Sequence, residues 1–131
     1  MLNKLDDIAI LVGRSLLGFY FLGPGIAKVF DYTNYISVMQ ENEVPLTLIA
    51  LPIVILIQVI GGIMLILNQN VKASALALFI TTIVINIYIH DFWTLEEGVI
   101  KAHETQNFVK NLAIAAGLLV LASREKFVKL G

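Results

Sequence analysis

The chain has 131 residues, of which 58% are hydrophobic and only 15% are charged, and its formal net charge is −1. A soluble domain carries about 25% charged residues, so this composition excludes an ordinary soluble domain and favours a protein folded in lipid. The near-zero net charge argues against the basic surface of a nucleic-acid-binding protein, and the absence of cysteine excludes a thiolate nucleophile or a cysteine-ligated iron–sulfur cluster in this chain.

Four apolar runs fill most of the sequence. A membrane-spanning helix needs about 20 mostly apolar residues, which three of the runs reach and the fourth approaches. The sequence therefore predicts an all-α fold, a polytopic membrane protein whose single transmembrane domain covers residues 1–131 as an antiparallel four-helix bundle. The predicted spans cover residues 8–30, 46–67, 71–89 and 108–122.

The segments outside the apolar runs predict a helix cap and the structure of the connections between the spans. Asp6 or Asp7 is expected to cap the first helix, because a carboxylate accepts hydrogen bonds from the free amides of a first turn. Residues 31–45 form the first long connection, in which the amphipathic residues 36–39 predict a short helix along the membrane interface. Residues 68–70 predict a tight turn, and residues 91–106 predict an acidic, polar loop.

The distribution of basic residues predicts the orientation. Lys and Arg near the span ends favour the cytoplasmic side. The side that carries both termini has more of them, so both termini are expected in the cytoplasm and both long loops outside. On the terminal side lie Lys4, Lys72, Arg124, Lys126 and Lys129, and on the other side lie Lys28, Lys101 and Lys110.

One stripe of the first run carries a charge into the membrane. A charged side chain at the bilayer centre costs about 2.5–3.5 kcal/mol on insertion scales, so Arg14 is expected to pair with a polar or charged group. At 3.6 residues per turn it shares a face with Gly18, Phe21, Gly25 and Lys28. Glycines allow close approach of another helix, so this stripe is predicted to face the bundle interior.

The predicted partner of Arg14 is Gln58. Counting about 1.5 Å per residue from the span ends places both side chains within about one turn in depth, and a glutamine oxygen can accept from a guanidinium. The alternative is that Arg14 extends to the cytoplasmic interface beside Asp6 or Asp7.

A second group of polar residues is expected at similar depth near the outer ends of the helices. One interpretation is a wet vestibule with Lys–Asp pairs, in which His90 relays protons or holds a ligand, because histidine changes charge near neutral pH. The other is that His90, Asp91 and Trp93 only anchor a helix end at the interface. The group consists of Lys28, Asp31, Asn86, His90, Asp91, Lys110 and Asn111.

No metal site is predicted. The two histidines, His90 and His103, do not have a helical spacing that would bind one ion, and His103 is expected in a polar loop. The sequence also lacks a phosphate-binding loop, a nucleophile triad and a zinc-binding spacing.

Several short motifs, taken in order along nearly the whole chain, resemble the DoxX family. They are Gly13-Arg14, Phe21, Gly25 and Lys28, then Gly61-Gly62, then His90-Asp91-Phe92-Trp93, and finally Phe108, Lys110, Asn111 and Leu112. The resemblance implies a small bacterial inner-membrane protein with four helices. The family is named after a subunit of an archaeal terminal quinol oxidase, and its members have been linked to thiosulfate–quinone oxidoreduction and to membrane complexes that handle oxidative stress.

This sequence departs from the family pattern at Gln58, where many members carry glutamate. A buried Arg–Glu pair would therefore be replaced by an arginine beside a neutral amide. Either Arg14 keeps more uncompensated charge, which would attract an anion or a quinone head, or the pair is structural and glutamine maintains the hydrogen bond.

Three functional hypotheses follow. The first is an accessory or quinone-interacting subunit of a membrane oxidoreductase, with quinone as the ligand and other oxidoreductase subunits as partners. The second is a carrier or channel-like protein for a small amphipathic or anionic solute, of which a homo-oligomer is one form, and the third is a structural or chaperone-like membrane partner. The candidate ligand-binding residues are Arg14, Lys28, Gln58, His90, Asp91, Lys110 and Asn111.

Overall fold

The computed structural model describes residues 3–128, and these residues form helices and connections without any strand. Four of the helices are long and apolar enough to cross a membrane, which confirms the predicted all-α polytopic bundle. A shorter helix, α2, occupies the first long connection, as expected. In chain order the helices are α1 (Lys4–Phe30), α2 (Tyr32–Glu41), α3 (Thr47–Leu67), α4 (Val71–Tyr88), the short 3₁₀ helix η1 (Phe92–Thr94) and α5 (Val99–Ser123).

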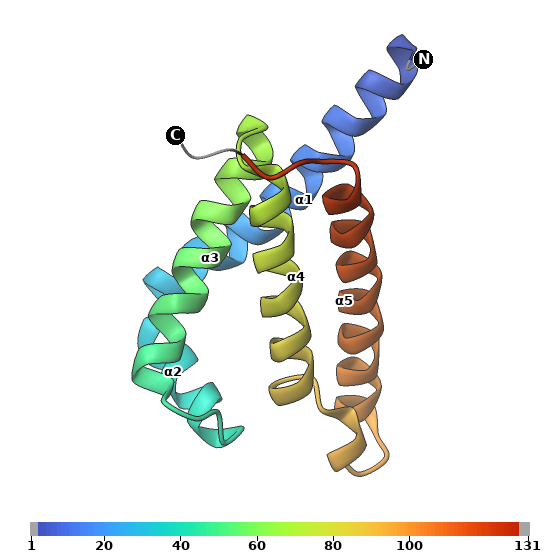
Figure 1. Ribbon diagram of the computed structural model, residues 1–131. Helices are drawn as coiled ribbons and strands as arrows, with labels where there is room; N and C mark the ends of the chain where they lie inside the picture. Colours follow the sequence, from blue (N-terminus) through green and yellow to red (C-terminus); the bar gives the residue numbers. More distant parts are fainter. Residues whose placement is uncertain (1–2, 129–131) are drawn as a thin grey trace.

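The long helices form two antiparallel pairs (Figure 1). α1 packs along α3, α4 packs along α5, and the contact between α3 and α4 joins the pairs. We call the end where α1 begins and α5 finishes the terminal end, and the opposite end, which carries α2 and η1, the α2 end. α3 and α4 meet at their turn at the terminal end and diverge toward the α2 end.

The hydrophobic core lies toward the terminal end. It combines the last turns of α3 and α5 with the first half of α4 and one aromatic ring from α1. The core therefore holds the diverging helices together at one end and leaves the α2 end more open. Its buried residues are Phe21, Leu65, Val71, Ala75, Leu78, Leu118, Leu121 and Ala122.

The tight turn between α3 and α4 is confirmed. Asn68 and Asn70 adopt left-handed backbone conformations with φ of 57° and 46°, which asparagine tolerates better than most residues. The backbone amides of Asn68 and Gln69 donate to carbonyls in the last turn of α3, so the chain reverses directly from α3 into α4.

The start of α1 corrects the expected cap. The Asn3 side chain accepts a hydrogen bond from the Asp6 backbone amide at 2.9 Å, and the Asp6 carboxylate accepts one from the Asn3 amide at 3.4 Å. Asn3 is therefore the N-cap, and Asp6 completes a reciprocal capping box instead of capping alone. The helix begins before the apolar run because this cap lies among polar residues.

The second long connection is shorter than expected. Residues 91–106 were predicted to form a polar loop, yet α5 begins at Val99 and places His103 and Glu104 on a helix. Lys, Ala, Glu and Gln are good helix formers, and Lys101 pairs with Glu97 one turn earlier. Hydropathy marks only the part of a helix that lies in lipid, so it underestimated the length of α5.

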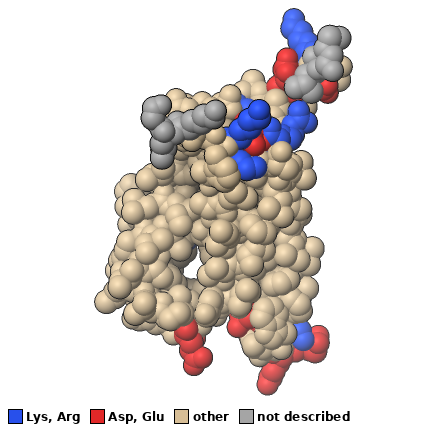
Figure 2. Space-filling view, in the orientation of Figure 1, with Lys and Arg blue, Asp and Glu red and all other residues tan. Residues whose placement is uncertain are grey.

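Charged side chains gather at the two ends of the bundle (Figure 2). On the face shown, most basic side chains lie at the terminal end, acidic side chains lie at both ends, and the band between them carries almost no charge. An uncharged band between charged ends is typical of a membrane protein. Lys129, which contributed to the orientation prediction, lies outside the described residues.

Candidate functional site

Arg14 is turned into the bundle, as its stripe predicts. Only 7% of its surface is exposed, and its Nε donates to the backbone carbonyl of Leu65 at 2.8 Å. Leu65 belongs to the last turn of α3, whose carbonyls form the negative end of the helix dipole, and among the described residues its carbonyl otherwise accepts only a long hydrogen bond of 3.4 Å from the Asn68 amide. Arg14 therefore caps the C-terminus of α3 and does not extend to the interface.

The predicted hydrogen bond between Arg14 and Gln58 does not form. Gln58 is buried beside Gly25, where a Cβ would lie 3.1 Å from the Gln58 Cβ, and within residues 3–128 its Oε1 accepts no hydrogen bond. Gly25 lies about 16 Å along α1 from Arg14. The close approach of Gly18 to Gly62 sets the register of α1 and α3, and counting from the span ends could not locate that contact.

Lys72 repeats the role of Arg14 on the second helix pair. Its Nζ donates to the Ala122 carbonyl in the last turn of α5 at 2.9 Å and lies 5.4 Å from the centre of the Phe127 ring. Each of these two cations at the terminal end thus neutralises a helix C-terminus. Both therefore have a structural explanation that requires no ligand.

Replacing Arg14 by methionine tests this explanation. The variant Arg14→Met keeps an unbranched side chain but loses the charge and the hydrogen bond to α3, so we expect a loss of about 1 kcal/mol in unfolding free energy. Unfolding in mild detergent, followed by circular dichroism, measures it. Lys4→Met, at an exposed position on the same helix, is the matched control. An unchanged stability of Arg14→Met would contradict the capping role.

A chain of polar side chains connects three helices nearer the α2 end. The Tyr20 hydroxyl donates to Asn111 Oδ1 at 2.9 Å, and Asn111 Nδ2 donates to Asn86 Oδ1 at 3.0 Å. Asn86 Nδ2 in turn donates to the Phe108 carbonyl at 3.0 Å. Asn86 and Asn111 are buried, so they satisfy each other inside the bundle. Asn111 thus belongs to this network and is not among the residues that line the cavity described next.

A cavity of about 320 Å³ lies where α3 and α4 diverge. α2, α3 and α4 form its walls, and their lining side chains are mostly apolar, among them Met39, Leu51 and Ile85. Figure 2 shows the molecule open in its lower half, between the part that carries α2 and α3 and the part that carries α4 and α5. Ligand sites in proteins have similar volumes and combine apolar walls with few polar groups.

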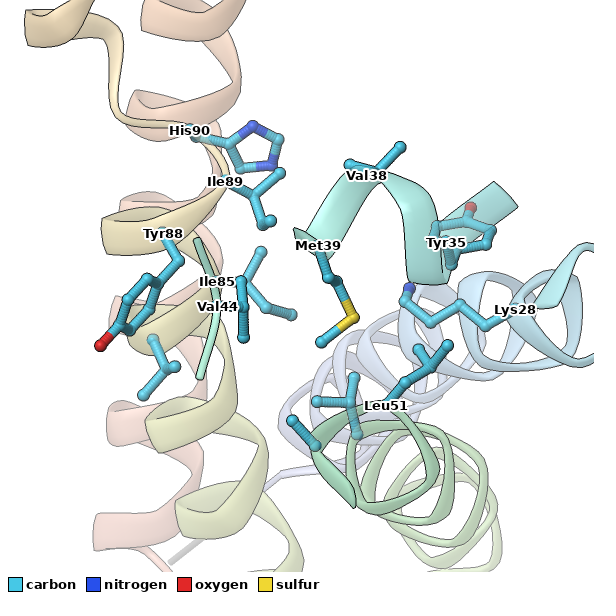
Figure 3. Close-up of a pocket in the computed structure, with 13 residues that line it drawn as sticks. Lys28, Tyr35, Val38, Met39, Val44, Leu51, Ile85, Tyr88, Ile89 and His90 are labelled. Carbon is cyan, nitrogen blue, oxygen red and sulfur yellow. The ribbon is translucent and has the colours of Figure 1, made fainter. Parts of the chain in front are cut away.

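Two of the predicted site residues line this cavity from different sides (Figure 3). Lys28 extends from α1 on one side, where its Nζ lies 5.0 Å from the centre of the Tyr35 ring. His90 follows α4 on the other side, and its Nδ1 lies 2.6 Å from Glu104 Oε2 on α5. The cavity therefore has a cationic group on one wall and a histidine on another.

The remaining polar residues of the expected vestibule lie elsewhere. Asp91 accepts from the Thr94 hydroxyl at 3.3 Å, Asp31 accepts from Asn34 at 3.2 Å, and Lys110 is exposed on the outside of α5. The expected Lys–Asp pairs do not form. Within residues 3–128 the contacts between basic and acidic side chains are His90–Glu104 and Lys101–Glu97. α1 ends at Phe30 and α4 at Tyr88, but α5 begins at Val99, so Lys110 and Asn111 lie within α5 and not at its end.

Sequence reasoning missed Tyr20 and Glu104. Tyr20 was one aromatic residue among several in an apolar run, and nothing in the run singled out its hydroxyl. Glu104 was assigned to a loop. Once α5 is known to start at Val99, helical spacing places Glu104 and Asn111 about two turns apart on one face, and this spacing could have indicated both contacts.

The fold and the cavity define a polytopic α-helical membrane protein with a mostly apolar cavity between its helices. This chain belongs to the DoxX family, whose family model matches residues 9–91. The chain is also 31% identical over 121 residues to the inner membrane protein YqjF of Escherichia coli strain K12, a match that covers 92% of this chain and 87% of that protein. No solved structure matches it. The four spans and this relative make it a multi-pass protein of the inner membrane.

Proposed function

We propose that this chain is a quinone-interacting accessory subunit of a membrane oxidoreductase system. The observation that carries the proposal is the apolar cavity of about 320 Å³ with Lys28 and His90 on different walls. A quinone ring has apolar faces and an oxygen at each end, so the walls would hold the ring and the Lys28 ammonium would donate to one oxygen. The protein would supply binding and electrostatics, and the quinone would supply the redox chemistry.

The orientation that accompanies this proposal places both termini in the cytoplasm. The excess of basic side chains at the terminal end supports it, since such residues favour the cytoplasmic side. The cavity at the α2 end would then open in the outer half of the bilayer. A lipid-soluble ligand would enter laterally between the two helix pairs, where the molecule is open.

Replacing Lys28 should weaken quinone binding. In lipid nanodiscs, a short-tailed benzoquinone is expected to raise the melting temperature of the wild-type protein, and Lys28→Met should reduce the affinity at least about tenfold, because hydrogen bonds from charged donors contribute about 1.5–3 kcal/mol. Lys110→Met is the matched control, since Lys110 lies outside the cavity on the exposed face of α5. Arg14→Met should also keep its affinity.

Two results would overturn the proposal. One is that the wild-type protein shows no quinone-dependent shift and yields no quinone when its extracted lipids are analysed by mass spectrometry. The other is that Lys28→Met and Lys110→Met bind the quinone equally well, because a ligand outside the cavity would not distinguish these lysines.

A carrier for a small amphipathic anion is the second candidate. It is favoured by Lys28, which lies against an aromatic ring and forms no ion pair with a carboxylate in the described part of the chain. Uptake of such an anion into proteoliposomes, lost in Lys28→Met and kept in Lys110→Met, would favour the carrier over the quinone subunit.

A further inference from the structure

His90 connects the cavity to a carboxylate on the neighbouring helix. Its Nδ1 lies 2.6 Å from Glu104 Oε2, and the two side chains are 18% and 25% exposed. The ring itself lines the cavity, and in Figure 3 one of its nitrogens is directed toward the cavity. Since Nδ1 is occupied by Glu104, the nitrogen on the opposite side of the ring, Nε2, is the atom available to a ligand.

The Glu104 contact determines what Nε2 can do. An ionised carboxylate can only accept hydrogen bonds, so in the neutral form of His90 the Glu104 contact places the hydrogen on Nδ1 and leaves the lone pair on Nε2. The labelled side chains next to it in Figure 3, Ile89 and Ile85, are apolar and offer no donor. A ligand that brings a donor can therefore form a hydrogen bond to Nε2 that a ligand with only carbonyl oxygens cannot form.

We propose that the cavity selects ligands whose head carries a hydroxyl group, of the phenol or hydroquinone class, and that this hydroxyl donates to Nε2 of His90. The proposal rests on the proposed function, because it concerns the same cavity, but it specifies the chemical form that binds. The Lys28 ammonium donates, whereas Nε2 accepts, so the two polar groups have opposite requirements. A hydroxyl group can donate to Nε2, which a carbonyl oxygen cannot do.

Glu104 is a positioning residue in this arrangement. It does not line the cavity, and it acts by fixing which nitrogen of His90 carries the hydrogen. A glutamine at the same position could either accept from Nδ1 or donate to it, so it would no longer select one tautomer. The effect of Glu104 should therefore appear as a change in ligand preference, which a purely structural contact would not produce.

The test compares two probes of nearly equal shape, 4-hexylphenol and its methyl ether 4-hexylanisole. Binding to the full chain in nanodiscs is measured by displacement of a labelled phenol and corrected for partition into nanodiscs without protein. We expect the phenol to bind the wild type about tenfold more tightly than the ether. Glu104→Gln should reduce this ratio to about threefold or less, and the exposed control Glu97→Gln should leave it unchanged.

The outcomes separate this inference from the proposed function. Equal affinities of the wild type for the phenol and the ether, with clear binding of both, would overturn the hydroxyl preference and leave the cavity as a ligand site. Failure of both probes and of the quinone to bind would overturn both proposals. If Glu104→Gln does not fold, His90→Phe replaces it: loss of the preference supports the inference, and a ratio that stays near tenfold overturns it.

Discussion

Replacing Gly18 by alanine is expected to destabilise the protein by about 3 kcal/mol, because added atoms in a close-packed interface force the surrounding structure to shift. A Cβ at Gly18 would lie 2.6 Å from the backbone oxygen of Gly62 and 2.6 Å from Cγ1 of Ile66. The Ile66 side chain could rotate away, but the Gly62 carbonyl belongs to the backbone of α3. α1 and α3 would therefore have to separate along the interface that fixes their register.

Gly13 provides the matched control on the same helix. A Cβ at Gly13 would meet no atom within 4 Å, so Gly13→Ala should be neutral or should stabilise α1 by up to about 1 kcal/mol through helix propensity. Both variants can be compared by reversible unfolding in mixed micelles. Similar stabilities of Gly18→Ala and Gly13→Ala would show that the two helices do not approach as closely as the structure places them.

The register of α1 against α3 also explains which predictions succeeded. Helical periodicity was enough to place Arg14, Gly18, Phe21 and Gly25 on the buried face of α1, because a face depends only on the sequence of one helix. The partner of Arg14 depends on how far two helices slide along each other. That displacement is set by the close approach of Gly18 to Gly62, and the sequence alone does not identify which glycines of the two helices are in contact.

The candidate site was predicted only in part for a related reason. Lys28 and His90 were expected at the outer ends of their helices, and they do line one cavity. Glu104 was missed because hydropathy stops at the membrane surface while α5 continues to Val99. The cavity arises because α3 and α4 diverge from their turn, and no single-helix pattern encodes such an angle.

Replacing one member of the buried Asn86–Asn111 amide pair should have the second large effect on stability. Asn111→Leu would leave the Tyr20 hydroxyl without its acceptor and Asn86 Oδ1 without its donor, so we expect a loss of about 2 kcal/mol in unfolding free energy. The hydrogen bond from Tyr20 joins α1 to α5, two helices with little other contact. Loss of Asn111 should therefore loosen the two helix pairs against each other, and unfolding in mixed micelles measures the cost.

A double-mutant cycle separates the hydrogen bond from a change in packing. Asn86→Leu alone should also destabilise, because it leaves the Asn111 amide nitrogen without the acceptor it has at 3.0 Å. The double variant removes both amides together and leaves fewer polar groups unpaired, so it should cost less than the sum of the single variants by about 1 kcal/mol, within the range measured for hydrogen bonds between membrane helices. Strict additivity would mean that the two amides do not interact. Tyr20→Phe provides a further check. In the Tyr20→Phe background, Asn111→Leu should cost less unfolding free energy, because no hydroxyl is then left without an acceptor.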